Sequence, residues 1–355
     1  TPLFAKRELY KISGHWDHYR DGMFVMGDSD KLDDPAEEVF ALRPMTCPFQ
    51  FQAYLTRTRS YRDLPLRYNE TSTLFRNEAS GEMHGLIRVR QFTISEGHLA
   101  CRPDQLEQEF AGCLELAKYC LETLGLDEDV SYRFSKWDAN NREKYIGDPE
   151  EWESVQNTMR TILNDLNVEY TEEDGEAAFY GPKLDIQIKN VFGKEDTLIT
   201  IQIDFQLAER FGMVYVDADG QKKFPYIIHR TSIGCYERTL ALLIEKYAGA
   251  LPLWLAPEQV RVIPISEKQQ ERANELLAQL KRAGLRAAAD LRSEKIGYKI
   301  REAQVEKVPY MLIIGDKELE ADTVSVRARK EGDTGAVTAE EFIGKALAEI
   351  AAKAK

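Results

Sequence analysis

Three arginines stand out in the stretch FRNEASGEMHGLIRVRQF, which covers residues 75–92. If the segment LIRVRQF is a β-strand, alternate side chains share a face, so Arg88 and Arg90 point the same way. Arg76 lies near the end of the preceding run of alternating apolar and polar residues, across a glycine-containing loop. Guanidinium groups bind phosphate oxygens through paired hydrogen bonds. The pattern therefore indicates a site for a polyanion lying across a sheet.

The same stretch supports a plainer interpretation. Glu78 and Glu82 lie within reach of the arginines in a hairpin. Arginine and glutamate on adjacent strands commonly form surface salt bridges that contribute little to stability. For a hairpin considered by itself, salt bridging is the favoured interpretation.

A second candidate is YIIHRTSIGCYERTLALLIEKYAG, residues 226–249. We expect a strand that ends at His229, a tight turn at Gly234, and a helix with Glu237 and Arg238 in its first turn. Arginine at a helix N-terminus is electrostatically unfavourable, which suggests that Arg238 meets an anion. The alternative is a solvated arginine, or one paired with Glu237 or another acid.

The helices and strands that position these residues follow one pattern in residues 1–250 and another in the rest of the chain. Residues 1–250 contain several alternating segments without crossover helices between them, together with helical patterns at 103–125, 150–166 and 234–248. This predicts an α+β fold, in which an antiparallel sheet packs against helices. The expected strands are PLRYNETSTLFRNE, LIRVRQFTISEGHLAC, GPKLDIQIKN, LITIQIDFQLA and YIIHRT.

A proline- and glycine-containing linker, AGALPLWLAPEQ, separates this part from the rest of the chain. We therefore predict domains at residues 1–252 and 257–355. In the second, strands and helices alternate, including a helix from Ser266 to Gly284 and a last helix after Thr338, which is typical of a smaller α/β domain.

Composition restricts the class of protein. The chain has 355 residues, a net charge of −13 and five cysteines with no C-x-x-C pair. This argues against a nonspecific nucleic-acid binder and against a disulfide framework. No apolar run is long enough to span a bilayer and no signal peptide opens the chain, so we expect a cytoplasmic protein without membrane association.

Several motifs in order resemble the class II aminoacyl-tRNA synthetases, and within them the threonyl-tRNA synthetase family. They are SGHWDHYRDGMF, RPMTCPF, SYRDLPLR, FRNEASGEMHGLIRVRQFT, FYGPK, IHRTSIGCYER and ADLRSEKIGYKIREAQVEKVPYMLIIGDKE. The resemblance covers nearly the whole chain. It implies a class II catalytic domain followed by an anticodon-binding domain, with ATP, Mg²⁺, threonine and tRNA(Thr) as partners.

The resemblance implies roles for residues around ATP. Arg76 would hold the α-phosphate, Glu78 the adenine amino group, and Arg88 and Arg238 the β- and γ-phosphates. Arg90 is given no ligand. Lys183 would be catalytic together with Arg76 and Arg238, and Gln202 would contribute on the ATP side.

A zinc ion is also implied, held by Cys47, His98 and His229. One thiolate and two imidazoles leave an open coordination position, as in catalytic zinc sites. That position would take the amino group and hydroxyl of threonine. The remaining implied residues line the amino-acid pocket (Met45, Cys47, Glu96, Tyr180, Thr200, Gln202, His229) or contact the anticodon (Ser293, Arg301, Glu318, Arg327).

The chain departs from the common bacterial pattern beside the pocket, where it has FTISEGH in place of FTQDDAH. Glu96 thus replaces the aspartate that contacts the threonine hydroxyl, and one extra methylene is enough to reposition a hydrogen bond. The triplet EGH is similar to that of prolyl enzymes. An alternative is therefore a synthetase-like paralogue, either an inhibitor-resistant copy or an enzyme for serine or proline.

Two further expectations concern what lies outside the chain. It begins at Thr1, and nothing in it resembles the N-terminal editing domain of the family. Pro2 matches the proline of the first family motif, whose preceding helix contributes to the dimer interface. We expect a homodimer for the full-length protein.

Overall fold

The computed structural model describes residues 1–355. It divides into two compact units, Thr1–Leu242 and Leu243–Lys355, which are described separately. This division falls inside helix α7 (Tyr236–Lys246). The domain boundary expected between residues 252 and 257 stays a prediction.

The first unit is built on a seven-stranded sheet, in which only the β7–β8 pair is parallel and the other neighbours are antiparallel. The predicted α+β class is confirmed. In spatial order the strands are β5 (Leu66–Phe75), β6 (Gln91–Cys101), β13 (Tyr226–Cys235), β10 (Glu195–Asp204), β9 (Lys183–Lys189), β7 (Val130–Lys136) and β8 (Thr171–Asp174).

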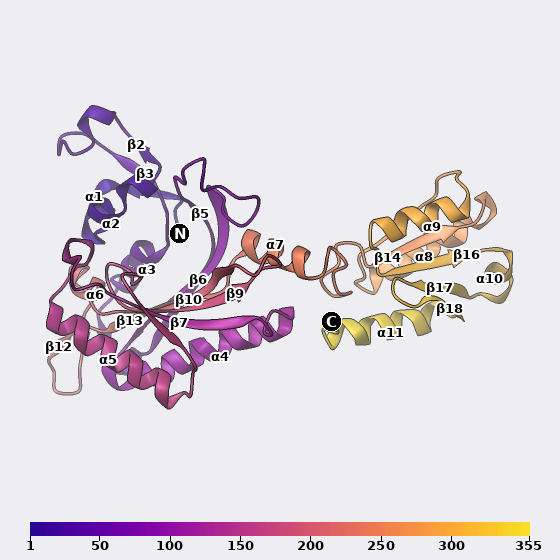
Figure 1. Ribbon diagram of the computed structural model, residues 1–355. Coiled ribbons are helices and arrows are strands. Elements are labelled where there is room, and N and C mark those ends of the chain that lie inside the picture. Colours follow the sequence, from indigo (N-terminus) through magenta and orange to yellow (C-terminus); the bar gives the residue numbers. More distant parts are fainter. The chain divides into compact units, whose positions relative to one another are not determined.

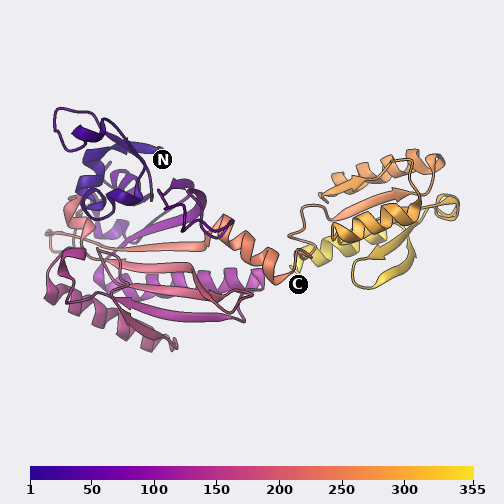
Figure 2. The ribbon, with the colours of Figure 1, turned by 45° about the horizontal axis from the view of Figure 1, so that its top comes forward.

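Helices cover one side of this sheet, where Figures 1 and 2 show α4 (Leu106–Leu124) and α5 (Pro149–Asp165). Apolar residues recur in α4 at three- and four-residue intervals, and Phe110, Leu114 and Ala117 are buried. Gly125, with φ of 72°, ends the helix in the left-handed conformation. The helices expected at 103–125, 150–166 and 234–248 are thus present.

The opposite side carries the N-terminal elements and a hydrophobic core that includes Tyr10, Trp16, Phe51 and Tyr215. The N-terminal elements are β1 (Phe4–Lys6), α1 (Arg7–Ile12), α2 (His15–His18), β2 (Val25–Met26), β3 (Phe40–Leu42), α3 (Cys47–Tyr54) and β4 (Arg59–Ser60). Later in the chain come α6 (Leu207–Arg210), β11 (Tyr215–Val216) and β12 (Lys222–Lys223), and β11 pairs with β4 and β12. Strand β1 pairs with β3, which also pairs with β2.

Three strand predictions are wrong at their ends. The strand predicted to continue to residue 208 stops at Asp204, where β10 ends, and helix α6 begins at Leu207. Residues 86–90 lie outside the sheet, and β6 begins only at Gln91. A turn at residues 85–87 joins His84 and Arg88, which bond to each other's backbone, and Arg90 O accepts the amide of Arg76. The strand predicted to end at His229 continues to Cys235 through a bulge. Gly234 permits this bulge, since its φ is +73° and an added Cβ would lie 2.0 Å from Leu198 O.

The second unit contains a five-stranded mixed sheet in the order β15 (Ala287–Ala289), β14 (Val260–Pro264), β16 (Tyr310–Ile314), β17 (Val324–Ala328) and β18 (Gly332–Val337). The first three strands are parallel and the last two antiparallel. Its helices are α8 (Gln270–Arg282), α9 (Ile296–Val305), α10 (Asp316–Ala321) and α11 (Ala339–Ala351). This confirms the α/β prediction.

The two predicted helix starts in the second unit have different outcomes. The helix expected from Ser266 begins only at Gln270, because residues 267–269 form a 3-10 turn, whereas the last helix begins directly after Thr338. Thr338 caps α11, because its hydroxyl accepts the amide of Glu341 while Glu341 accepts the amide of Thr338. Helix α10 and strand β18 were not predicted. Both are short, and β18 contains two glycines, so neither has a clear periodic pattern.

Candidate functional site

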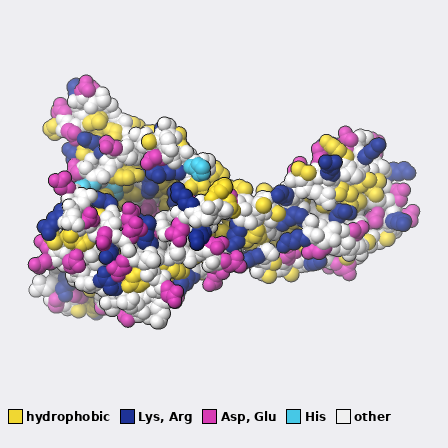
Figure 3. All heavy atoms as spheres, viewed as in Figure 1, with side chains coloured by type: hydrophobic (Ala, Val, Ile, Leu, Met, Phe, Trp, Pro, Cys, Tyr) yellow, Lys and Arg dark blue, Asp and Glu magenta, His cyan; other side chains and the backbone are white.

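A cavity of about 180 Å³ opens in the first unit between the loop that follows β5, the strands β6, β10 and β13, and the start of α7. Figure 3 shows a hollow on this unit in which dark-blue Lys and Arg side chains gather. Seven of the predicted site residues line the cavity: Arg76, Glu78, Arg88, Glu96, Thr200, Gln202 and Arg238. The fold thus brings together side chains that lie up to 162 positions apart in the sequence.

Arg76 faces this cavity without a carboxylate partner. Its guanidinium carbon lies 5.1 Å from the centre of the Phe92 ring, and its Nε is buried without a hydrogen bond. A buried donor that lacks an acceptor is costly unless a ligand provides one. Arg76 is therefore arranged to receive an anion.

Arg238 also faces the cavity without a carboxylate partner. Its Nε donates to Ile87 O at 3.0 Å and its Nη1 to Thr197 O at 2.6 Å. Burial lowers the pKa of this guanidinium, and the nearby charge of Arg76 acts in the same direction. Pairing with Glu237 is ruled out as an interpretation, because that carboxylate accepts the amide of Thr93 at 2.9 and 3.1 Å.

Arg88 differs from the other two arginines. It lies 2.8 Å from Glu78 and 3.4 Å from Glu82, and its Nε also donates to Glu78. The salt-bridge interpretation therefore describes Arg88 in this structure. Arg90 donates from Nε to the backbone oxygen of Glu78 and braces the same loop.

Glu96 points into the cavity from β6. Its Oε2 accepts two hydrogen bonds from Thr46, at 3.0 Å from the amide and 2.5 Å from the hydroxyl. No hydrogen bond engages Oε1. The carboxylate is thus tied at one oxygen and open at the other.

A fully buried carboxylate, Asp185, organises another group of predicted residues. Its Oδ2 accepts from Lys183 Nζ at 2.8 Å, and its Oδ1 accepts from Thr200 Oγ1 at 3.1 Å. Arg133 and Ser135 donate to Oδ2 at 3.3 and 2.7 Å. Sequence reasoning missed Asp185, although its alternation with Lys183 on one strand places both side chains on the same face.

Tyr180 connects the cavity to the histidines. Its hydroxyl donates to Gln202 Oε1 at 2.5 Å, and its ring stacks on His229 with the centres 4.8 Å apart. Burial raises the pKa of this phenol, so the hydroxyl stays protonated and acts as a donor. Met45 is buried in the hydrophobic core that also contains Cys47 and Tyr180.

Cys47, His98 and His229 form a buried cluster whose ligand atoms all lie within 4.8 Å of one another. His98 and His229 are direct partners on the adjacent strands β6 and β13, and Cys47 opens α3. Burial raises the pKa of the Cys47 thiol and lowers that of His98. A cation would favour the thiolate and the neutral imidazoles, which are the forms that bind metal.

The other nitrogen of each histidine is occupied. His98 Nδ1 lies 2.7 Å from Gln50 Oε1, and His229 Nε2 lies 2.8 Å from Asp204 Oδ2. His98 Nε2 is buried with no hydrogen-bond partner. Metal-binding histidines typically bond through their second nitrogen to such partners, so this cluster fits a metal. Gln50 and Asp204 are functional candidates that the sequence did not reveal.

The second unit distributes the predicted anticodon residues over separate elements. Ser293 lines a cavity of about 520 Å³ near the carboxyl ends of the parallel strands, and Arg301 is exposed on α9. Glu318 on α10 accepts the amide of Gly315, whereas Arg327 on β17 has a buried Nε without a partner. No hydrogen bond joins any two of these residues.

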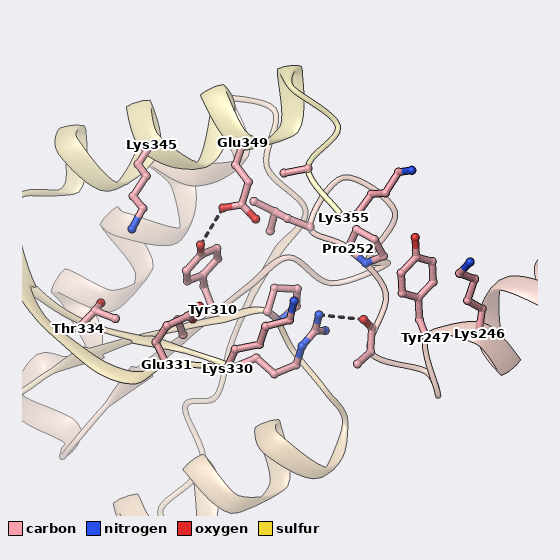
Figure 4. Close-up of a pocket in the computed structure, with 16 residues that line it drawn as sticks. Lys246, Tyr247, Pro252, Tyr310, Lys330, Glu331, Thr334, Lys345, Glu349 and Lys355 are labelled. Atoms are coloured by element: carbon pink, nitrogen blue, oxygen red, sulfur yellow. Dashed lines mark hydrogen bonds between the residues drawn. The ribbon is translucent and has the colours of Figure 1, made fainter. Parts of the chain in front are cut away.

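Another cavity in this unit, of about 640 Å³, contains none of the predicted residues (Figure 4). In it Tyr310 donates to Glu349 at 2.7 Å, and Arg329 donates to the backbone oxygens of residues 250 and 251 at 2.9 Å. These polar groups are satisfied within the fold.

Comparison with known families agrees with this architecture. The tRNA synthetase class II core domain (G, H, P, S and T) matches residues 31–247, and the anticodon binding domain matches residues 259–349. The fold is thus that of a class II aminoacyl-tRNA synthetase.

Individual relatives narrow the family. The chain is 66% identical over 351 residues to threonine–tRNA ligase of Clostridium perfringens. The aligned residues make up 99% of this chain and 54% of that protein. The chain is 46% identical to the same ligase of Halalkalibacterium halodurans over 97% of the chain and 52% of that protein.

A crystal structure of the RNA binding domain of threonyl-tRNA synthetase from Cryptosporidium parvum Iowa II superposes with a TM-score of 0.90 at 32% identity. It covers 98% of this chain and 85% of that one. The chain belongs to the threonyl-tRNA synthetase family, and it spans about half the length of the curated relatives it matches. None of its helices combines the length and apolar character required to cross a membrane.

Proposed function

We propose that this chain is the threonine-activating and tRNA-charging part of a threonine–tRNA ligase, without an editing domain within residues 1–355. The proposal rests mainly on two partly buried arginines, Arg76 and Arg238, which face one cavity without carboxylate partners. Paired cations of this kind suit a triphosphate. Their position close to a Cys/His/His cluster suits an amino acid whose carboxylate reacts with ATP.

In the proposed reaction the threonine carboxylate attacks the α-phosphate of ATP, and pyrophosphate leaves. Arg76 holds the α-phosphate, and Arg238 holds the leaving end together with Mg²⁺ bound to ATP. Glu78 binds the adenine amino group. Arg88 binds the β- and γ-phosphates from the edge of the cavity, where its Nε and Nη2 atoms pair with Glu78 and Glu82.

Asp185 gives Lys183 and Thr200 fixed positions at the amino-acid side. Lys183 contributes positive charge near the reacting carboxylate, and Thr200, Gln202 and Tyr180 line the pocket. Met45 closes its apolar wall. Fixed donors of this kind lower the cost of reorganisation during the reaction.

Zn²⁺ is the metal that the donor set fits best, with Cys47, His98 and His229 as ligands. A bound zinc would supply a Lewis acid that holds the amino group and hydroxyl of threonine. Gln50 and Asp204 orient the two imidazoles. Glu96 accepts a hydrogen bond from the substrate hydroxyl.

For the tRNA, we assign anticodon contacts to Ser293, Arg301, Glu318 and Arg327 in a domain of residues 257–355. Residues 1–252 form the catalytic domain. Carboxylates and guanidinium groups offer directional hydrogen bonds to base edges. The homodimer expected for the full-length protein is part of the same proposal.

Amino-acid-dependent exchange of pyrophosphate into ATP tests this function. Threonine should support exchange best, serine weakly and valine hardly at all, because valine leaves the site's polar groups unpaired. Exchange with proline or serine but not threonine would refute the substrate assignment and favour the paralogue. Charging of tRNA(Thr) by the same preparation tests the transfer step.

Elemental analysis tests the metal separately. We expect about one zinc per chain in the purified protein, as for a site with three protein ligands. Cys47→Ser should lose it, whereas Cys120→Ser, outside the cluster, should retain it. Equal zinc content in both variants would contradict the ligand assignment.

A further inference from the structure

Thr46 uses its hydroxyl in an unusual way. It immediately precedes α3 and is fully buried. A threonine at this position normally accepts hydrogen bonds from amides of the first helical turn. Here no such bond forms, and the hydroxyl instead donates to Glu96 Oε2 at 2.5 Å.

Only one oxygen of the Glu96 carboxylate is therefore hydrogen-bonded. The amide and the hydroxyl of Thr46 both donate to Oε2, at the N-terminus of α3, where the helix dipole also favours negative charge. Oε1 of Glu96 receives no hydrogen bond, and the residue lines the cavity. Thr46 therefore determines where the free oxygen of Glu96 lies.

We infer that Thr46 is a positioning residue that sets amino-acid selectivity through Glu96. This inference rests on the proposed function. Glutamate reaches one methylene further than aspartate and has one more rotatable bond. Two hydrogen bonds from Thr46 remove that freedom and hold Oε1 where the hydroxyl of threonine can donate to it.

Removing the tether has a selective consequence. In Thr46→Val the amide bond to Oε2 remains but the shorter hydroxyl bond is lost, so the carboxylate can rotate. The hydroxyl of threonine then gains less from Glu96. The penalty against valine also decreases, because a mobile carboxylate can find water instead of remaining unpaired.

The test is exchange kinetics on the whole chain with threonine, serine and valine. Thr46→Val should lower kcat/KM for threonine about tenfold to a hundredfold, with KM for ATP changed by less than about twofold. Discrimination against valine should fall in parallel. Thr46→Ser, which keeps the hydroxyl, should restore most of the activity. Thr56→Val is the matched control, since its hydroxyl bonds only to Ala53 O at the other end of α3.

Two further measurements exclude a merely structural effect. The double variant Thr46→Val, Glu96→Gln should be no worse than Glu96→Gln alone, because Thr46 acts through that carboxylate. Zinc content should equal that of the wild type although Cys47 is adjacent. Additive losses, loss of zinc, or wild-type kinetics in Thr46→Val would each overturn the inference.

Exchange measured with the wild-type protein shows whether a failure concerns this inference or the proposed function. If it fails to support exchange with threonine, the proposed function is wrong. The same variants are then compared with whichever amino acid supports exchange, and unchanged selectivity there overturns the inference. If no amino acid supports exchange, both are overturned.

Discussion

Two arginines that line the cavity of the first unit differ from the ion-paired arginines of the second unit. In the first, Arg76 and Arg238 face a cavity and have no carboxylate partner. In the second, Arg261 lies 2.7 Å from Glu258, and Arg292 lies 2.6 Å from Asp290. Cations paired within the fold contribute modestly to stability, whereas unpaired cations at a cavity are costly unless an anion binds. This difference supports the proposal that ATP binds in the first unit.

Not every arginine of the second unit is ion-paired. Arg286 and Arg329 donate to backbone oxygens, and Arg327 also lacks a carboxylate partner. It lies on β17 opposite Met311, and its Nε is buried without a partner. Among the four predicted anticodon residues it is thus the one whose environment resembles that of Arg76. The comparison predicts that Arg327 contributes more to tRNA recognition than Glu318, which is engaged with Gly315.

The largest effect on stability is expected at Asp185, a buried carboxylate of the first unit whose charge is paired. Asp185→Asn leaves Lys183 and Arg133 without their shared buried carboxylate, and we expect a loss of about 3 kcal/mol or more in the free energy of unfolding. Urea unfolding measures it. Asp165→Asn, on the exposed end of α5, serves as the control, and equal stability of the two variants would contradict the role of Asp185 as an organising centre.

For an unpaired arginine we expect the opposite: a large loss of activity and little loss of stability. Arg76→Ala should lower pyrophosphate exchange about a hundredfold to a thousandfold, as for removal of one charge-stabilising donor, while stability changes little or rises. Exchange kinetics and urea unfolding are measured on the same variant. The exposed Arg142→Ala should leave both unchanged. A large loss of stability in Arg76→Ala would mean that Arg76 is structural, and the contrast between the units would fail.

A smaller effect is expected in the second unit. Arg327→Ala should lower kcat/KM for charging tRNA(Thr) about tenfold, which corresponds to one lost base contact, without affecting pyrophosphate exchange. Arg282→Ala, at the exposed end of α8, is the matched control. If charging by Arg327→Ala equals that of the control, the buried Nε of Arg327 has no role in recognition.

The smallest effect on stability is expected at Glu172, an ion-paired carboxylate at the edge of the first sheet. Glu172 on β8 accepts from Arg160 at 2.7 Å and lies 2.9 Å from Lys136. The hydrogen bond from Arg160, with a further contribution from Lys136, lowers the pKa of Glu172 to about 2. The ionised form therefore stabilises the fold above the usual pKa of 4.5, and this contribution is lost as the pH falls from 4.5 towards 2.

We expect Glu172→Gln to cost less than about 1 kcal/mol at pH 7, because solvent screens a side chain that is 31% exposed. The difference from wild type in urea unfolding should shrink between pH 4.5 and pH 2. Glu143→Gln, exposed and without such partners, is the control. A difference that is independent of pH would indicate lost packing rather than lost charge.

The sequence was informative wherever the determining pattern is local. Periodicity placed α4, α5, α8 and α11 and most of the strands, and the last helix begins after Thr338 as predicted. It failed at residues 86–90 and at the end of β13. There a loop satisfies its own backbone bonds, or a bulge lets a strand continue, and neither leaves a periodic signal.

By itself the sequence determined the residue types that can do the chemistry and the α+β and α/β order of the elements. Resemblance supplied Cys47, His98 and His229, which no spacing rule connects. Only the tertiary structure decided the partners: Gln50 with His98, Asp204 with His229 and Thr46 with Glu96, at separations of 48, 25 and 50 residues. The physical reason is that a side chain's hydrogen-bond partner depends on strand register and on the packing of distant segments, which local sequence does not specify.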